Sequence, residues 1–129
     1  HRIPLSLQSL ILLEQLSILN QGSKWLIPSP YANDNPITPH AYSRTVRNNR
    51  EHFGLERFTP HDLRRTTASQ MTALGVPRVV VSKILNHVET GITAVYDRHS
   101  YDNEKREALN KWGEALEEAV QNFTSSLNL

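Results

Sequence analysis

The stretch that decides the fold runs from Thr59 to Gly75 and reads TPHDLRRTTASQMTALG. It opens with Thr59-Pro60, a pair typical of a helix start, because threonine caps free backbone N–H groups and proline suits the first helical position. Gly75 suits the left-handed turn that closes many helices. The stretch therefore predicts an α-helix from His61 to about Leu74.

Upstream, Thr38-Pro39 repeats the same start signal. The pattern predicts a second helix to about Asn49. Three arginines spaced three residues apart are expected to share one face of it: Arg44, Arg47 and Arg50.

Capping residues and apolar spacing predict further helical segments. One follows Pro4, is capped by Ser6, and is expected to be core through apolar residues at helical spacing: Leu7, Leu10, Ile11, Leu13 and Leu16. Others span about 77–85, 92–98 and 102–122. The last carries an apolar stripe: Leu109, Trp112, Leu116, Ala119 or Val120, and Phe123.

Strand signal is nearly absent from the chain. Residues 1–5 look like the tail of a strand, and residues 25–27 like one short extended piece. The predicted fold class is mainly α, with at most a short residual β segment.

The amino-acid composition excludes some classes of function and favours others. The 129 residues are 38% hydrophobic, enough for one core, and include no cysteine, which excludes disulfides and thiolate chemistry. No apolar run reaches the roughly 18 residues of a membrane span, so no membrane partner is expected. The lack of cysteine fits a cytoplasmic protein. The net charge is only +1, but six arginines lie between Arg44 and Arg65 while acids collect from Asp102 onward. The basic middle is the part suited to phosphate.

His61 and Arg64 are the first candidates for chemistry. They lie three apart near a predicted helix start, so both side chains are expected on one face. The planar guanidinium of arginine donates two hydrogen bonds to phosphate oxygens and keeps its charge. By itself His-x-x-Arg is a weak signal, and a capping histidine with a surface arginine is the favoured interpretation of it. Downstream, however, His87 is followed nine residues later by Tyr96.

The chain resembles the tyrosine recombinases of the phage integrase type in an ordered set of residues: His61, Arg64, His87 and Tyr96. The phrase HDLRRT at residues 61–66 belongs to the same pattern. Residues 1–6 resemble the segment after the family's catalytic-domain hairpin, and residues 96–112 resemble the C-terminal region of prophage and genomic-island integrases.

The resemblance implies that residues 1–129 form the C-terminal part of a multi-helical catalytic domain, with a docking helix at about 102–122. It implies site-specific DNA integration, in which Tyr96 joins the DNA 3′ phosphate and releases a 5′ hydroxyl. Arg64 and His87 then contact the phosphate, and His61 takes or shares the phenolic proton. A phenol has a pKa of about 10, so it needs such help near neutral pH.

The resemblance also implies partners. These are duplex DNA attachment sites and other recombinase subunits in a tetramer, with no cofactor and no metal. The arginines predicted to contact DNA are Arg44, Arg47, Arg50 and Arg65.

The chain begins at His1, and its only methionine is Met71, so it is interpreted as a piece of a longer protein. The family's second catalytic arginine and its lysine are expected upstream of His1. Lys24 falls in a loop past the family position. The fragment alone is therefore expected to be inactive.

Alternatives remain at the level of single residues. Tyr101 is a second candidate nucleophile, although it lies 14 residues after His87. His87 is also a candidate helix terminator through carbonyl contacts. A metal site formed by His61, His87 and His99 lacks any His-x-x-x-His pair.

A different class of function is a helix-turn-helix regulator formed by residues 68–82, presenting Arg78 and Ser82 to bases. Residues 79–81 are all valine, which suits burial better than a polar groove. A protein-interaction module acting through the final helix is a third possibility.

Overall fold

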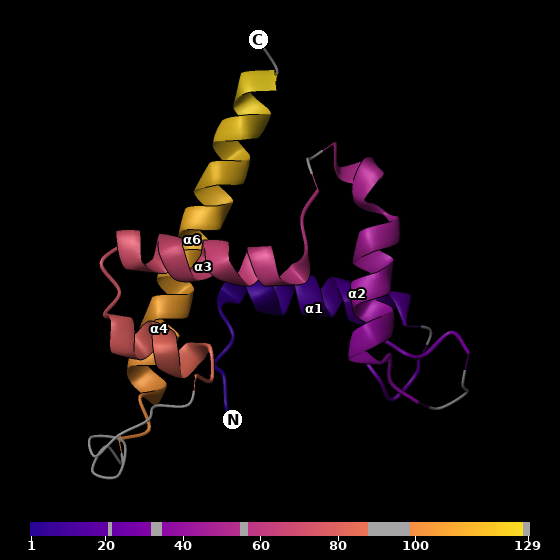
Figure 1. The fold of residues 1–129 in the computed structure, drawn as a ribbon, viewed down its shortest axis with the longest axis horizontal. Helices are drawn as coiled ribbons and strands as arrows, with labels where there is room; N and C mark the ends of the chain where they lie inside the picture. The colour runs from indigo at the N-terminus through magenta and orange to yellow at the C-terminus, as the bar shows by residue number, and fades with distance from the viewer. Residues whose placement is uncertain (21, 32–34, 55–56, 88–98, 128–129) are drawn as a thin grey trace. The chain divides into compact units, whose positions relative to one another are not determined.

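The computed structural model describes residues 1–20, 22–31, 35–54, 57–87 and 99–127. These residues are mainly helical, as predicted (Figure 1). The elements are α1 (Leu7–Leu19), α2 (Pro39–Asn48), the 3-10 helix η1 (Arg50–Phe53), α3 (Pro60–Ala73), α4 (Arg78–Ile84) and α6 (Asp102–Leu127). The chain divides into two compact units, one of residues 1–9 with 67–129 and the other of residues 10–66.

The only β feature of the described residues is an isolated antiparallel bridge between Pro28 and Pro36. Backbone hydrogen bonds from Ile37 to Ile27, at 2.9 Å, and from Ser29 to Asn35, at 2.8 Å, support it. Residues 25–27, where the sequence predicted a short extended piece, are bends, and the bridge lies at the residue that follows them. The strand tail predicted at residues 1–5 is wrong, since these residues are irregular and have no strand partner among the described residues.

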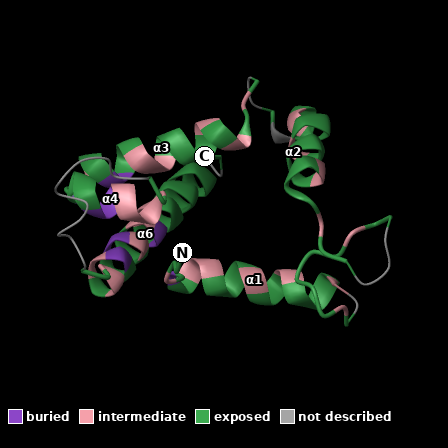
Figure 2. Cartoon of the chain, turned by 60° about the horizontal axis from the view of Figure 1, so that its bottom comes forward, coloured by how far each residue is buried: buried purple, intermediate pink, exposed green. Residues whose placement is uncertain are grey.

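The core of the first unit forms where α4 packs against the first half of α6. Its buried members lie on α3, α4, α6 and the turn after α3 (Figure 2): Met71, Val76, Val80, Val81 and Ala108. Leu109 and Trp112 pack against this cluster from α6. The predicted contribution of Trp112 to the core is confirmed.

Helix α3 ends in a left-handed turn. At the end of α3, Gly75 has φ of 82°, its N–H donates to Thr72, and the N–H of Val76 donates to Met71. This pair of bonds is the Schellman motif, in which the left-handed residue lets the chain reverse. The predicted closure at Gly75 is confirmed.

Helix α6 also holds the N-terminal segment in place. The Lys105 side chain is only 7% exposed; it pairs with Asp102 at 2.8 Å and donates to the Arg2 carbonyl at 3.1 Å. Gly113 is buried, and a Cβ atom there would lie 3.0 Å from Oγ of Ser6. Residues far apart in sequence thus meet through the hydrogen bond of a buried lysine and through a glycine that leaves room for Ser6.

Two predictions about apolar faces need correction. No residue of α1 is buried, and Leu10 is 50% exposed, so the helix is not core among the described residues. Its apolar side chains include Leu12 and Ile18, which lie off the predicted stripe, so the helix is apolar all round rather than on one side.

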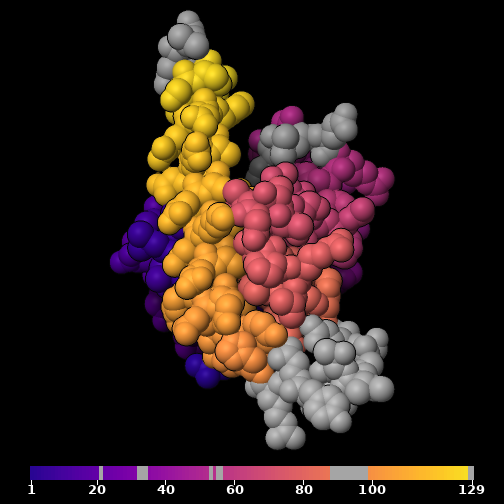
Figure 3. Space-filling view, turned by 90° about the vertical axis from the view of Figure 1, so that its left-hand side faces the viewer, coloured from indigo at the N-terminus to yellow at the C-terminus, as the bar shows by residue number. Residues whose placement is uncertain are grey.

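Helix α6 continues past the predicted end at about Asn122 to Leu127. Within this last part of the helix, the hydroxyls of Thr124 and Ser125 donate to carbonyls four residues earlier, at 2.9 Å each. Its C-terminal part, yellow in Figure 3, extends past α4 with Phe123 65% exposed. The stripe is therefore core only in its first half.

None of the described helices combines the length and apolar character needed to cross a bilayer.

Candidate functional site

The first turn of α3 presents His61 and Arg64. Thr59 closes this turn through a reciprocal pair of bonds, because its hydroxyl accepts from the N–H of Asp62 at 3.3 Å while its own N–H donates to the Asp62 carboxylate at 3.0 Å. The arrangement is a capping box built with aspartate. It confirms the start signal read from Thr59-Pro60.

The carboxylate of Asp62 is held in its charged form. Hydrogen bonds from Thr59 lower the pKa of Asp62, and the positive charges of Arg65 and His61 lower it further. The charged carboxylate stabilises the positive end of the helix. His61 and Arg64 are both exposed, and their spacing places them on one face of this capped turn.

A pocket of about 400 Å³ adjoins the start of α3. Its lining comes from α2, η1, the loop before α3 and the first helical turn: Ser43, Arg47, Arg50, Arg57, Phe58, Thr59, Pro60 and His61. Three of these side chains are arginines and none is acidic. We call this site the arginine pocket. Its electrostatics favour an anion such as phosphate.

The arginine pocket gathers some of the predicted DNA contacts and not others. Arg47 and Arg50 line it with His61, whereas Arg44, Arg64 and Arg65 are absent from its lining. The guanidinium of Arg44 donates to Nε2 of its helix neighbour His40 at 3.3 Å. The sequence interpretation did not name Arg57 as a DNA contact, although it is one of the six arginines of the basic middle of the chain.

The expectation that the three spaced arginines share one α-helix is wrong for Arg50. Helix α2 ends at Asn48, and Arg50 begins η1. Asn49 interrupts the helix because its side chain donates to the Thr45 carbonyl at 2.9 Å, and the guanidinium of Arg50 then bonds to the Arg47 carbonyl at 3.1 Å. The predicted cap at Thr38 is confirmed, since its hydroxyl accepts from Ala41 at 3.1 Å.

His87 belongs to the other unit, where it follows the end of α4. Asn86 takes a left-handed conformation with φ of 54°, its N–H donates to Lys83 at 3.2 Å, and the N–H of His87 donates to Ser82 at 3.0 Å. This is the motif found at Gly75, with asparagine in the glycine position.

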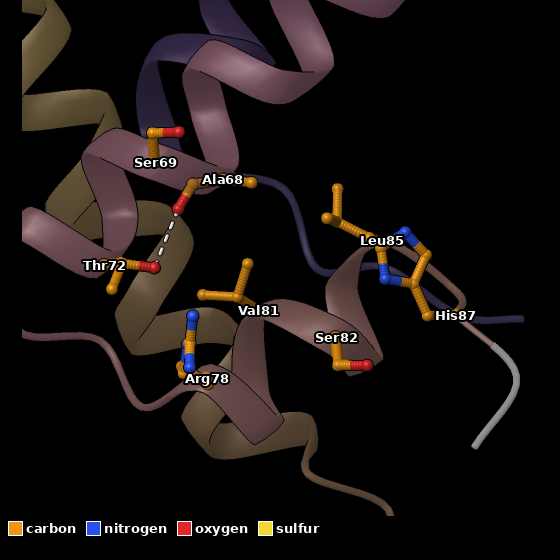
Figure 4. A pocket seen from close by; sticks show the side chains of 8 residues that line it. All are labelled: Ala68, Ser69, Thr72, Arg78, Val81, Ser82, Leu85 and His87. Atoms are coloured by element: carbon orange, nitrogen blue, oxygen red, sulfur yellow. Dashed lines mark hydrogen bonds between the residues drawn. The ribbon is translucent and has the colours of Figure 1, made fainter. Parts of the chain in front are cut away.

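The backbone of His87 therefore ends the helix, while its exposed side chain lines a pocket between α3 and α4 (Figure 4). The bond that the structure describes between His87 and a carbonyl of α4 comes from the backbone N–H. The alternative that the imidazole itself terminates α4 stays open.

Tyr96, with the helical stretch expected at 92–98, lies outside the described residues. The rival tyrosine is described: Tyr101 packs against the core, with Nζ of Lys83 5.3 Å from its ring centre. Nearby His99 bonds to Glu104 at 2.8 Å. The described residues include no group of three or more metal-ligating side chains.

The predicted catalytic residues thus fall in two units: His61 and Arg64 in one, His87 in the other. The surroundings of His61 and Arg64 are described within one unit, and those of His87 within the other. Their convergence on one phosphate stays a prediction.

Comparison with known proteins matches this pattern. A family model described as "Phage integrase family" matches residues 1–103. The prophage integrase IntA of Escherichia coli (strain K12) is 26% identical over 121 residues, which cover 92% of this chain and 28% of that relative. No solved structure matches the chain. Since the matched region contains the capped turn with His61 and Arg64, the arginine pocket and the turn that presents His87, the chain belongs to the phage integrase family.

Proposed function

We propose that this chain is the C-terminal part of the catalytic domain of a tyrosine recombinase that integrates DNA at specific sites. The observation that carries the proposal is the arginine pocket, in which Arg47, Arg50 and Arg57 lie beside His61 and no acidic side chain belongs to the lining. Such a lining suits the phosphates of the DNA backbone, because it has arginines to contact them and no negative side chain to repel them.

Tyr96 is the proposed nucleophile. Its phenolic oxygen forms a bond to the phosphorus of the scissile phosphodiester while the bond from phosphorus to the 5′ oxygen breaks. The products are a 3′-phosphotyrosyl link and a 5′ hydroxyl, and the reverse attack by a hydroxyl rejoins the strand. The covalent link conserves the energy of the broken bond, so the cycle needs neither ATP nor a metal.

The remaining residues manage protons and charge. His61 accepts or shares the phenolic proton, which raises the nucleophilicity of a group whose ordinary pKa is about 10. Arg64 and His87 donate hydrogen bonds to the non-bridging oxygens, where negative charge grows in the transition state. The left-handed turn at Asn86 presents His87 for this contact.

Complete activity is proposed to need residues beyond this chain, which spans only 28% of the length of its prophage relative. A second arginine would clamp the phosphate, and a lysine would protonate the departing 5′ oxygen. Loss of one oxyanion donor costs about 10²–10³ in rate and loss of an acid about 10²–10⁴. The fragment alone is therefore proposed to be inactive.

The proposed partners are duplex attachment sites and neighbouring subunits of a tetramer. The proposed setting is the cytoplasm, as part of a prophage or genomic island. A helix-turn-helix regulator is less well supported, because Val80 and Val81 are buried in the core instead of facing a groove.

Trapping on a nicked, labelled suicide substrate tests the proposal. The intact recombinase that contains this sequence should form a covalent protein–DNA adduct, Tyr96→Phe should abolish it, and Tyr101→Phe should retain it. The 129-residue chain should give no adduct. Efficient trapping by the short chain would show its catalytic set to be complete, and an adduct that survives Tyr96→Phe would refute the assignment of the nucleophile.

A further inference from the structure

One of the two pockets that His87 lines also contains Arg78, a cationic side chain that the catalytic pattern does not use. It encloses about 500 Å³ between α3 and α4. Its lining residues all belong to one unit: Ala68, Ser69, Thr72, Arg78, Val81, Ser82, Leu85 and His87. We call it the α3–α4 pocket.

The polar side chains of this pocket suit an anion. Thr72 donates its hydroxyl proton to the Ala68 carbonyl at 2.9 Å, so the remaining donors on the wall are Arg78, His87 and the hydroxyls of two serines. No acidic residue lines the pocket or pairs with Arg78 in the part of the chain that the structure describes. Neighbouring pockets of the unit differ, since Glu104 and Glu107 line one of them.

The spacing of Arg78 and His87 along α4 indicates a polyanion instead of a small phosphate. Arg78 begins α4 and His87 follows its end, and the seven residues of α4 span about 10 Å. Figure 4 shows the two side chains on either side of Val81 and Ser82. Donors at the two ends of such a helix suit separate phosphates of a DNA strand, which repeat about every 3.4 Å along the helix axis.

We propose that Arg78 binds a backbone phosphate of the DNA strand a few nucleotides from the phosphate contacted by His87. The inference rests on the proposed recombinase function and adds a contact that positions the substrate. Arg78 lies outside the reacting atoms, so it holds the strand against α4 while His87 meets the scissile phosphate. Arginine contacts to the backbone set the register of a protein on DNA without reading its sequence.

The test is duplex binding by the intact recombinase at several salt concentrations. Arg78→Gln should weaken binding roughly 10-fold and reduce the log–log salt slope by about 0.9, equally for attachment-site and unrelated DNA. Arg78→Lys should restore most of the slope. The matched control is Arg106→Gln, an exposed arginine on α6 in the same unit, which should leave the slope unchanged.

Methylphosphonate substitution locates the contact. Neutralising one phosphate near the cleavage site should weaken DNA binding by the parent protein. The same neutralisation should cause no further loss of binding in Arg78→Gln. Losses that add at every position would overturn the proposal. A loss confined to particular base sequences would also overturn it, because it would mean that Arg78 reads bases.

The adduct assay separates this inference from the proposed function. If the parent protein traps DNA through Tyr96 but Arg78→Gln binds and traps normally, only the α3–α4 contact is refuted. If the parent protein neither binds nor traps duplex DNA, the recombinase proposal itself fails.

Discussion

The N–H of His87 donates to the carbonyl of Ser82 at 3.0 Å, and this bond closes α4 directly before a predicted catalytic side chain. The bond forms only because Asn86, between α4 and His87, has a φ of 54°. Asparagine tolerates this left-handed region better than most residues, and glycine tolerates it without penalty.

Substitution of Asn86 should therefore separate backbone from side-chain effects. Asn86→Gly should leave unfolding and adduct formation intact, whereas Asn86→Val should destabilise the fold by about 1–2 kcal/mol and lower the adduct yield. Denaturant unfolding and suicide-substrate trapping of the intact recombinase measure the two effects. Equal behaviour of the glycine and valine variants would mean that the turn does not govern His87.

The arginine pocket predicts a shared electrostatic footprint. We expect a reduction of about 0.9 in the magnitude of the salt slope for DNA binding from each of three changes: Arg47→Gln, Arg50→Gln and Arg57→Gln. The reason is that binding releases fewer counterions when one phosphate contact is lost. The control is Arg106→Gln on α6. Arg44, which already contacts His40, is expected to contribute less. Unchanged slopes in all three pocket variants would exclude the pocket as a phosphate site.

The capping box of α3 predicts an acid-sensitive helix start. Asp62 has a lowered pKa in the folded chain because Thr59 donates to its carboxylate. A lowered folded pKa contributes stability above the unfolded value of about 3.9, and that stability is lost as pH falls through the folded pKa.

The free energy of unfolding should thus fall between neutral and acidic pH, and this fall should be smaller in Asp62→Asn. Thr59→Ala should lower stability by about 1 kcal/mol at neutral pH, where the cap is intact. Identical pH profiles for the parent and Asp62→Asn would show that the carboxylate does not hold the cap.

The two halves of α6 should respond differently to truncation of an aromatic side chain. Trp112 packs against the core, so Trp112→Ala should destabilise the fold by about 3–5 kcal/mol. Phe123 is 65% exposed, so Phe123→Ala should leave unfolding nearly unchanged. If the exposed half docks on another subunit, Phe123→Ala should instead weaken assembly on DNA, as measured by sedimentation. Equal destabilisation by both changes would contradict the exposed position of Phe123.

Local signals in the sequence determined where helices begin and end. Thr38 and Thr59 cap their helices, and Gly75 closes α3, as their residue types predicted. These features depend on hydrogen bonds between residues a few positions apart, so neighbouring residues suffice to specify them. The order of His61, Arg64, His87 and Tyr96 likewise pointed to the family, and the assignment of Tyr96 rests on that order alone.

Only the tertiary structure decided which side chains share a surface. Arg57 joined Arg47 and Arg50 in a pocket because separate elements meet there, and Arg78 joined His87 because α3 and α4 fold onto one another. Helix α1 is as apolar as a core helix, yet it has no buried residue. Burial and shared pockets depend on contacts between segments far apart in sequence, and the spacing of residues within one segment does not specify those contacts.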